Sequence, residues 1–267
     1  MPEIALVVTD LDGTLWSGAE ETHPSTVEAW RALEARGIPV VVATGRRVGS
    51  TRRPLARLGL TPPAVVLNGA LVVDLATDER FHRHQYEADD AARVLAAFRD
   101  VGVEPCVYVE HADVAVFVGD RPSTHPEHVR GLGTEARTGD LGEVVADVPV
   151  LMFGLVGHDP APFGDLQGAL AGVAEVHISR DHYGGHTCTV TPLGLSKWVG
   201  VTVYCERRGI DPARVLAIGD GPNDRELLER AAIAVVPEDA HAAALQLADH
   251  IVASPRDGGW AEILDLV

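Results

Sequence analysis

Four aspartates at short spacing are the residues of this chain best suited to chemistry. Asp10 and Asp12 come directly after an apolar run that begins at Ile4. Asp220 and Asp224 follow a second apolar run late in the chain. Closely packed carboxylates raise one another's pKa unless a cation lies among them. Oxygen donors without histidine or cysteine nearby in sequence favour a hard ion, so the pattern predicts a Mg²⁺ site.

Lysine is nearly absent from the chain, which makes its one occurrence informative. The 22 basic residues are arginines except for Lys197. Whatever bias replaced lysine by arginine spared this position, which indicates a site where a compact ammonium cannot be exchanged for a planar guanidinium. Survival of one lysine by chance is the alternative.

Further polar side chains come at the ends of other apolar runs. Thr44, Gly45 and Arg46 follow the run 38–43, and Asn68 follows the run 64–67. Structural roles are the alternatives: Thr44 could satisfy a loop amide, Asn68 could hold a turn, and Arg46 could pair with a surface carboxylate.

Strands and helices alternate in the first 70 residues and again after residue 196. Short β-branched runs predict buried strands, and apolar residues at helical spacing that end at glycine predict helices. Such alternation is typical of a parallel sheet with helices on both faces. The predicted strands are 4–9, 38–43, 64–67, 215–218, 232–236 and 250–253, and the predicted helices are 25–36, 48–58, 196–208, 223–231 and 240–247.

The middle of the chain has a different pattern. Strands at 103–109 and 114–118 flank Glu110–Asp113, which predicts a hairpin, and helices are expected near 87–100 and 161–171. We therefore predict an α/β fold: a Rossmann-like, doubly wound parallel sheet core with an inserted α+β cap domain. Residues 1–83 and 186–267 are assigned to the core and 84–185 to the cap.

Ligands of open α/β sheets bind outside the carboxyl ends of the strands, so the polar clusters should meet at one edge. Their order along the chain resembles the four motifs of the haloacid dehalogenase superfamily, and the position of the insertion resembles the Cof-type sugar-phosphatase branch with a type IIB cap. The matching segments are Asp10-Leu11-Asp12-Gly13-Thr14, Thr44-Gly45-Arg46, Lys197 and Gly219-Asp220-Gly221-Pro222-Asn223-Asp224.

The resemblance implies a magnesium-dependent phosphatase that forms an aspartyl-phosphate on Asp10, with Asp12 as general acid and base. Thr44 and Lys197 complete the implied catalytic set by contacting the phosphoryl group. The expected substrate-binding residues are Thr44, Gly45, Arg46, Asn68, Lys197, Asn223 and His186, and the expected metal-binding residues are Asp10, Asp12, Asp220 and Asp224. Asn223 and Asp224 could instead orient the metal shell or the ammonium.

Two other functions use the same motifs: a phosphomutase of this superfamily, and a noncatalytic module that binds phosphate or a metal. Substrate selection is expected in the insertion, where the run Arg180–His186 joins polar, aromatic and glycine residues. His186, and His182 as an alternative, could reach the substrate, although loop solubility explains the run nearly as well. The substrate is expected to be a small phosphorylated metabolite such as a sugar phosphate.

The composition excludes several classes of protein. The formal net charge of −17 disfavours binding to nucleic acid or to an anionic membrane. No apolar run approaches the roughly 20 residues of a membrane-spanning helix. The three cysteines are widely separated, which argues against a disulfide framework or a zinc cluster. We expect a soluble cytoplasmic enzyme, and its oligomeric state cannot be read from the sequence.

Overall fold

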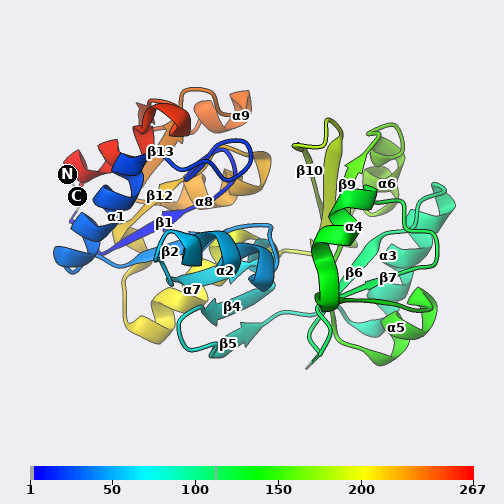
Figure 1. Ribbon diagram of the computed structural model, residues 1–267. Coiled ribbons are helices and arrows are strands. Elements are labelled where there is room, and N and C mark those ends of the chain that lie inside the picture. Colours follow the sequence, from blue (N-terminus) through cyan, green and yellow to red (C-terminus); the bar gives the residue numbers. More distant parts are fainter. Residues whose placement is uncertain (1–2, 112) are drawn as a thin grey trace. The chain divides into compact units, whose positions relative to one another are not determined.

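The computed structural model describes residues 3–111 and 113–267, which form two compact units (Figure 1). The first unit combines the described residues up to His82 with Ser196–Val267. The second unit is the insertion Arg83–Leu195. Each unit has its own sheet and its own apolar core. The predicted fold class, a Rossmann-like core with an inserted α+β unit, is confirmed.

In the described part of the chain, the sheet of the first unit has eight strands in the order β14-β13-β12-β1-β2-β3-β4-β5. The pairs from β14 to β3 are parallel. The strands are β1 (Leu6–Thr9), β2 (Val40–Ala43), β3 (Pro63–Val66), β4 (Leu71–Asp74), β5 (Arg80–Arg83), β12 (Val215–Ile218), β13 (Ile233–Pro237) and β14 (His250–Val252).

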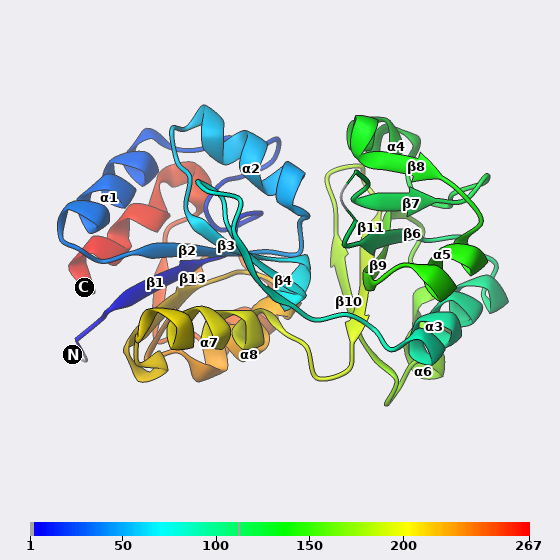
Figure 2. The same ribbon diagram turned by 90° about the horizontal axis from the view of Figure 1, so that it is seen from below.

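Helices cover both faces of this sheet, as a parallel sheet buried on both sides requires. Figure 2 shows α1 and α2 on one face and α7 and α8 on the other. The fully buried valines of β1 and β2 supply apolar side chains to both layers. The helices are α1 (Pro24–Ala35), α2 (Val48–Arg57), α7 (Lys197–Arg208), α8 (Arg225–Arg230) and α9 (Ala242–Leu245), with short 3₁₀ turns at Leu67–Gly69, Pro212–Arg214, Pro222–Asp224, Pro255–Asp257 and Gly259–Asp265.

The sequence did not predict the edge of the sheet formed by β4 and β5. After β3 the chain turns back within five residues, so β4 pairs antiparallel with β3. The turn uses left-handed backbone at Leu67 and Asn68, with φ of 52° and 54°. Asn68-Gly69 is a turn signal in the sequence, but the signal does not say that the chain returns antiparallel beside β3.

The second unit contains a sheet with strand order β10-β11-β9-β6-β7-β8 among its described residues. Helices α3, α5 and α6 pack apolar side chains against it. The strands are β6 (Cys106–Val109), β7 (Val116–Val118), β8 (Ala136–Thr138), β9 (Val150–His158), β10 (Ala174–Arg180) and β11 (His186–Pro192). The helices are α3 (Ala88–Asp100), α4 (Pro126–Leu132), α5 (Leu141–Asp147) and α6 (Phe163–Ala169), with a 3₁₀ turn at Gly133–Glu135.

The second unit extends further along the chain than the sequence boundary at residue 186. Strand β11 begins at His186 and pairs antiparallel with both β10 and β9, so its backbone belongs to the inserted sheet. The predicted pairing of the strands on either side of residues 110–113 is seen as antiparallel β6 and β7. Ala112, within the predicted hairpin turn, lies outside the described residues.

Two absences predicted from the sequence concern membranes and disulfides. Across residues 3–111 and 113–267, none of the helices combines the length and apolarity needed to cross a bilayer. Cys106, Cys188 and Cys205 are free and buried.

Helix α7 approaches the sheet closely at Gly200. A Cβ atom on Gly200 would lie 2.4 Å from Cγ1 of Val65 and 3.3 Å from Cα of Gly69. Val65 is fully buried and its β-branched side chain has little rotational freedom. Glycine at this position therefore sets how closely α7, which begins at Lys197, lies on the sheet.

In Gly200→Ala, overpacking should cost about 1–3 kcal/mol, whereas the better helix propensity of alanine should contribute ~1 kcal/mol in the opposite direction. We therefore expect a net loss of stability. Denaturant unfolding followed by circular dichroism measures the change. Gly168→Ala in α6 is the control, because a Cβ there meets no atom within 4 Å. A Gly200→Ala protein as stable as wild type would contradict the proposed close approach.

Candidate active site

Four neighbouring parallel strands bring the predicted site residues to one edge of the core sheet. β12, β1, β2 and β3 are adjacent, and Thr9 is in register with Ile218. Asp10 therefore leaves β1 beside the point where Asp220 leaves β12. Thr44 directly follows β2, and Asn68 follows β3. The predicted convergence at the carboxyl ends of the strands is present in the structure.

Lys197 lies between two of the aspartates. Its Nζ is 2.9 Å from Oδ1 of Asp10 and 2.7 Å from Oδ1 of Asp224. The lysine side chain and that of Asp224 are fully buried, and Asp10 is nearly so. Ser196 accepts a hydrogen bond from the Val199 amide and so begins α7 at Lys197. The helix start thus places the ammonium in the cluster.

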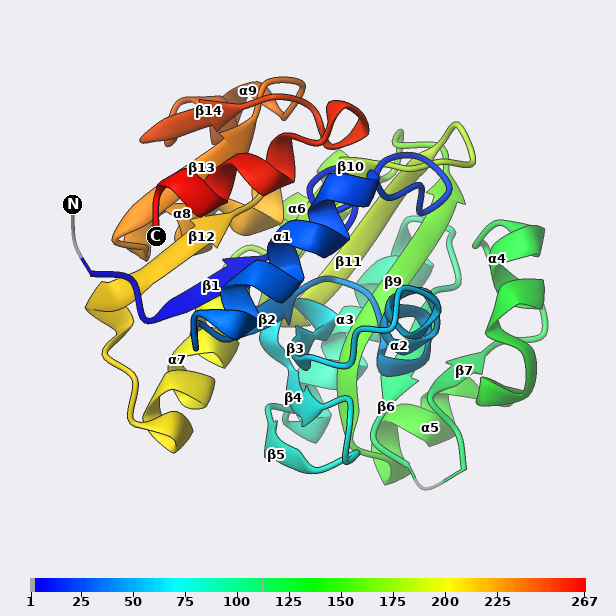
Figure 3. The ribbon, with the colours of Figure 1, turned by 60° about the vertical axis from the view of Figure 1, so that its left-hand side comes forward.

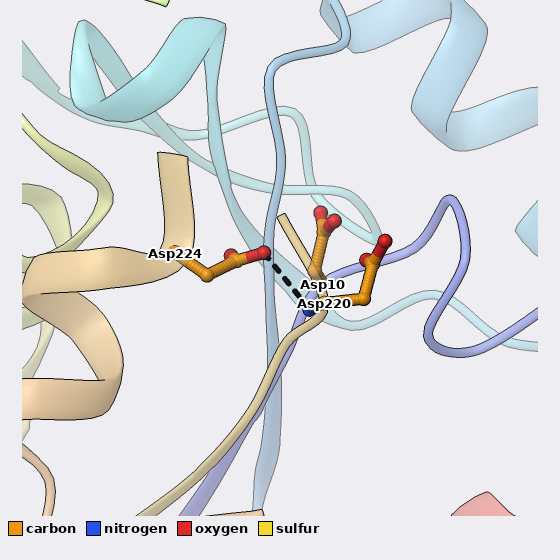
Figure 4. A group of neighbouring side chains, drawn as sticks. All are labelled: Asp10, Asp220 and Asp224. Carbon is orange, nitrogen blue, oxygen red and sulfur yellow. Dashed lines mark hydrogen bonds between the residues drawn. The ribbon is translucent and has the colours of Figure 1, made fainter. Parts of the chain in front are cut away.

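Both carboxylate oxygens of Asp224 have protein partners. Oδ1 accepts from Lys197, and Oδ2 accepts from the backbone amides of Asp220 and Gly221 at 3.1 and 2.9 Å. Figure 4 shows Asp224 reaching the Asp220 amide across the loop. These contacts fit the alternative role considered for Asp224, in which it orients the Lys197 ammonium and the loop, and its place in the metal-binding set stays a prediction.

Asp220 accepts a hydrogen bond from the Thr14 hydroxyl at 2.8 Å. Gly13 lies against the same carboxylate: a Cβ there would be 2.4 Å from Oδ2 of Asp220, and its φ of 80° is left-handed. Glycine is required at position 13 for both reasons. One ligand atom from each of Asp10, Asp220 and Asp224 fits within 4.8 Å of the others, close enough to hold a metal ion.

The cluster carries an excess of negative charge. The cluster holds three carboxylates and one ammonium, which contacts Asp10 and Asp224, so two negative charges are uncompensated when all the groups are ionised. Burial, opposed by Lys197 and reinforced by Asp224, raises the pKa of Asp10 to about 7. Burial and the nearby charges of Asp10 and Asp224 also raise the pKa of Asp220 well above its ordinary value. The buried, oxygen-rich cluster fits a divalent cation in charge and in chemistry.

Asp12 is turned toward Arg46 and is half exposed. The guanidinium donates to both carboxylate oxygens, from Nε at 2.6 Å and from an Nη at 2.5 Å, and the Trp16 indole N–H donates at 3.0 Å. Desolvation raises the pKa of Asp12, but Arg46 outweighs it, so the pKa lies below the ordinary value. Arg46 also binds Glu20 at 2.5 Å and lies over the Trp16 ring. Arg46 thus pairs with the carboxylates of Asp12 and Glu20, and pairing with a carboxylate is the structural alternative that the sequence left open for it.

Thr44, Gly45, Asn68 and Asn223 lie together beside the aspartates. The Thr44 hydroxyl accepts from the Arg46 amide at 3.2 Å, and the Asn223 side chain donates to Oδ1 of Asn68 at 3.0 Å. A Cβ on Gly45 would lie 3.1 Å from that same oxygen. The Asn223 contact supports the left-handed backbone of Asn68, a strained conformation that is frequent at functional sites.

His186 lies in the second unit, where it begins β11 and faces Arg180 in the strand pairing. Its neighbour Asp181 organises the β10–β11 loop, accepting from the amides of Tyr183 and Gly185 and from the Gly157 amide at 2.6 Å. His182 packs against the ring of Tyr183.

Three residues near the aspartates were not identified from the sequence: Thr14 on Asp220, and Trp16 and Glu20 in the network of Asp12 and Arg46. Thr14 lies inside the first motif, which offered a signal. Trp16 and Glu20 lie in a loop whose path cannot be read from residue spacing.

Comparisons with known proteins agree with this geometry. The model of the haloacid dehalogenase-like hydrolase family matches residues 7–264, nearly the whole chain. The chain belongs to this family. The predicted family and the predicted enzyme class, a hydrolase of the phosphatase type, are confirmed.

Individual relatives are similar over their full length. A phosphoglycolate phosphatase of Methanopyrus kandleri is 29% identical over 263 residues, which cover 97% of this chain and 95% of that protein. The 5-amino-6-(5-phospho-D-ribitylamino)uracil phosphatase YitU of Bacillus subtilis is 26% identical, covering 97% and 96%. A solved subclass IIB sugar phosphatase has the same fold, with a TM-score of 0.78, 22% identity and 98% of each chain covered.

The charge excess predicts how the metal-free protein responds to pH. Asp10 has an unfolded pKa near its ordinary value of 3.8 and a folded pKa of about 7. The folded state therefore holds a proton that the unfolded state has lost, and stability falls as pH rises from about 4 to 7. In EDTA we expect the Tm to fall over this range.

Asp220→Asn tests the origin of this dependence. Replacing the Asp220 carboxyl by a neutral amide removes its repulsion with Asp10 and Asp224, so it should raise the Tm in EDTA at high pH, and the gain over wild type should shrink as the pH falls toward 5. Asp239→Asn, at an exposed position, is the charge-matched control. If the Tm of wild type and of Asp220→Asn changed with pH in parallel, repulsion within the aspartate cluster would not be the cause of the pH dependence.

Proposed function

We propose that this chain is a magnesium-dependent phosphatase that hydrolyses the phosphomonoester of a small metabolite through an aspartyl-phosphate on Asp10. The observation that carries the proposal is the cluster of Asp10, Asp220 and Asp224, in which buried Lys197 pairs with Asp10 and Asp224 and Asp220 lies partly exposed beside them. One Mg²⁺ ion would be held by the carboxylates of Asp10 and Asp220 and by the backbone carbonyl of Asp12, and when bound it would neutralise negative charge.

In the first half-reaction a carboxylate oxygen of Asp10 attacks phosphorus. The bond from phosphorus to the ester oxygen breaks, and the leaving alkoxide takes a proton from Asp12. Lys197 fixes the position of the Asp10 carboxylate and offers its ammonium to the transferring group. Thr44 is proposed to donate its hydroxyl to a phosphoryl oxygen, since its oxygen already accepts from the Arg46 amide.

In the second half-reaction water attacks phosphorus, its proton goes to Asp12, and Asp10 is released as a free carboxylate. This step needs Asp12 ionised, the form that Arg46 favours. The first step needs Asp12 protonated. We propose that an incoming phosphate draws Arg46 away from Asp12, which gives Arg46 the substrate-binding role expected from the sequence.

The substrate is proposed to be selected by the insertion. Support comes from the β10–β11 loop, which Asp181 holds in place and where Tyr183 stacks on His125 with 4.4 Å between ring centres. His182 and His186 remain candidates for substrate contact, and Asn68, Gly45 and Asn223 for phosphate contact. Phosphoglycolate and sugar phosphates are the first substrates to test, because similar phosphatases are named for them.

The proposal includes a cytoplasmic location. Three buried, free cysteines support it, since thiols persist in reducing compartments.

Asp10→Asn should abolish phosphate release from a panel of phosphorylated metabolites, because the nearly isosteric amide cannot attack phosphorus. A loss of several orders of magnitude in kcat is expected.

Wild type should be inactive in EDTA, active with Mg²⁺ and poorly active with Ca²⁺, which prefers more ligands at longer distances. Activity in EDTA would exclude the metal, and more than about a tenth of wild-type rate in Asp10→Asn would exclude the covalent route.

Lys197→Arg should be nearly as damaging as Lys197→Ala, although the charge is kept. A guanidinium is broader than the ammonium that lies within 3 Å of both Asp10 and Asp224 and would displace one of them. We expect kcat to fall by two or more orders of magnitude, about 3 kcal/mol of transition-state stabilisation, with a smaller change in KM.

Thermal melts identify any variant that fails to fold, and exposed Arg225→Lys is the control for exchanging the two cations. A kcat of Lys197→Arg within about threefold of wild type would contradict the proposal that the Lys197 ammonium positions Asp10 and contacts the transferring phosphoryl group.

A further inference from the structure

The backbone of Asp10 is held on both sides, although β1 ends one residue earlier. Its amide donates to the Ile218 carbonyl at 2.9 Å and so continues the pairing with β12. Its carbonyl accepts from the Thr9 hydroxyl at 2.7 Å. Thr9 is fully buried, so this hydrogen bond is shielded from water.

A third residue fixes the Thr9 hydroxyl. The indole N–H of Trp260 donates to Oγ1 of Thr9 at 3.0 Å, also in a buried position. An indole nitrogen can only donate, so the hydroxyl oxygen accepts from Trp260 and its own proton is left for the Asp10 carbonyl. The direction of the relay is therefore fixed from Trp260 through Thr9 to Asp10.

Trp260 is placed by the turn before it and by a stacked partner. Its ring lies on that of Trp30 in α1, with 5.7 Å between centres and 15° between planes. Figure 3 shows the C-terminal segment alongside α1. A Cβ on Gly259 would lie 1.8 Å from the Ala253 carbonyl oxygen, and Gly258 has a φ of 84°. Two glycines thus allow the turn that directs the indole inward.

We propose that Trp260 is a positioning residue that acts through the Thr9 hydroxyl on the backbone of Asp10. The inference rests on the proposed role of Asp10 as nucleophile. In-line attack tolerates little displacement, and the direction of the Asp10 carboxylate follows from its backbone. A residue 250 positions away in sequence thereby holds the attacking group in place.

The test separates the indole hydrogen bond from ring packing. Trp260→Phe keeps an aromatic ring but removes the N–H, and with Mg²⁺ and p-nitrophenyl phosphate we expect kcat to fall about five- to tenfold, with KM within about twofold. Trp30→Phe is the matched control, because its ring belongs to the same stack but its N–H donates to Glu34 at 3.0 Å. Its kcat should stay within about twofold of wild type.

The Thr9 variants test the middle of the relay. Thr9→Val, nearly isosteric, should lose kcat as Trp260→Phe does, and Thr9→Ser should retain it. The double variant Trp260→Phe/Thr9→Val should be no slower than Thr9→Val alone, since both remove one pathway. Unchanged kcat in Trp260→Phe, an equal loss in Trp30→Phe, or additive losses in the double variant would each overturn the proposal.

Asp10→Asn distinguishes failure of the relay from failure of the proposed function. If Asp10→Asn is inactive while Trp260→Phe is unaffected, the relay is wrong and the nucleophile stands. If Asp10→Asn remains active, the proposed nucleophile is wrong and the relay has no catalytic role.

Discussion

The structure depends on a charge imbalance that folding does not remove. Asp10, Asp220 and Asp224 are brought together, with the ammonium of Lys197 between Asp10 and Asp224, and the burial of Asp10 and Asp224 limits the screening of their repulsion by water. The raised pKa values of Asp10 and Asp220 are the direct consequence. A fold accepts such a cluster only if the rest of the molecule holds it in place, and the proposed magnesium ion would relieve the repulsion.

The surrounding scaffold is built to hold these groups close. Parallel pairing of β1 with β12 sets Asp10 beside Asp220, and the start of α7 sets Lys197 against both Asp10 and Asp224. Glycine at positions 13 and 200 permits contacts that a Cβ would prevent. The aspartates differ in their contacts: Asp224 accepts from Lys197 and from two loop amides, whereas Asp10 has Lys197 and Asp220 has the Thr14 hydroxyl as side-chain partners, so these two carboxylates are proposed to bind the cation.

The edge of the sheet could be predicted because strand ends are visible in the sequence: each apolar run stops directly before Asp10, Thr44 or the Gly219–Asp224 segment. The partners of the side chains could not be predicted, because the spacing of residues along the sequence does not show which way a side chain points. The pairing of Asp12 with Arg46 and the engagement of Asp224 by the loop amides depend on local backbone direction. The antiparallel β4 and the extension of the inserted sheet through β11 depend on tertiary pairing, which local patterns do not record.

Magnesium binding to the metal-free protein, followed by isothermal titration calorimetry in buffers of different ionisation enthalpy, tests the charge imbalance most directly. If the cation replaces the proton that Asp10 holds below its pKa of about 7, binding near pH 6.5 releases protons, and this release shrinks as the pH rises to 9, where Asp10 is already ionised. The predicted result for wild type is binding of one Mg²⁺ per chain with that pH-dependent proton release. Asp220→Asn is predicted to lose Mg²⁺ binding. Binding without proton release at either pH, or unchanged binding in Asp220→Asn, would contradict the account.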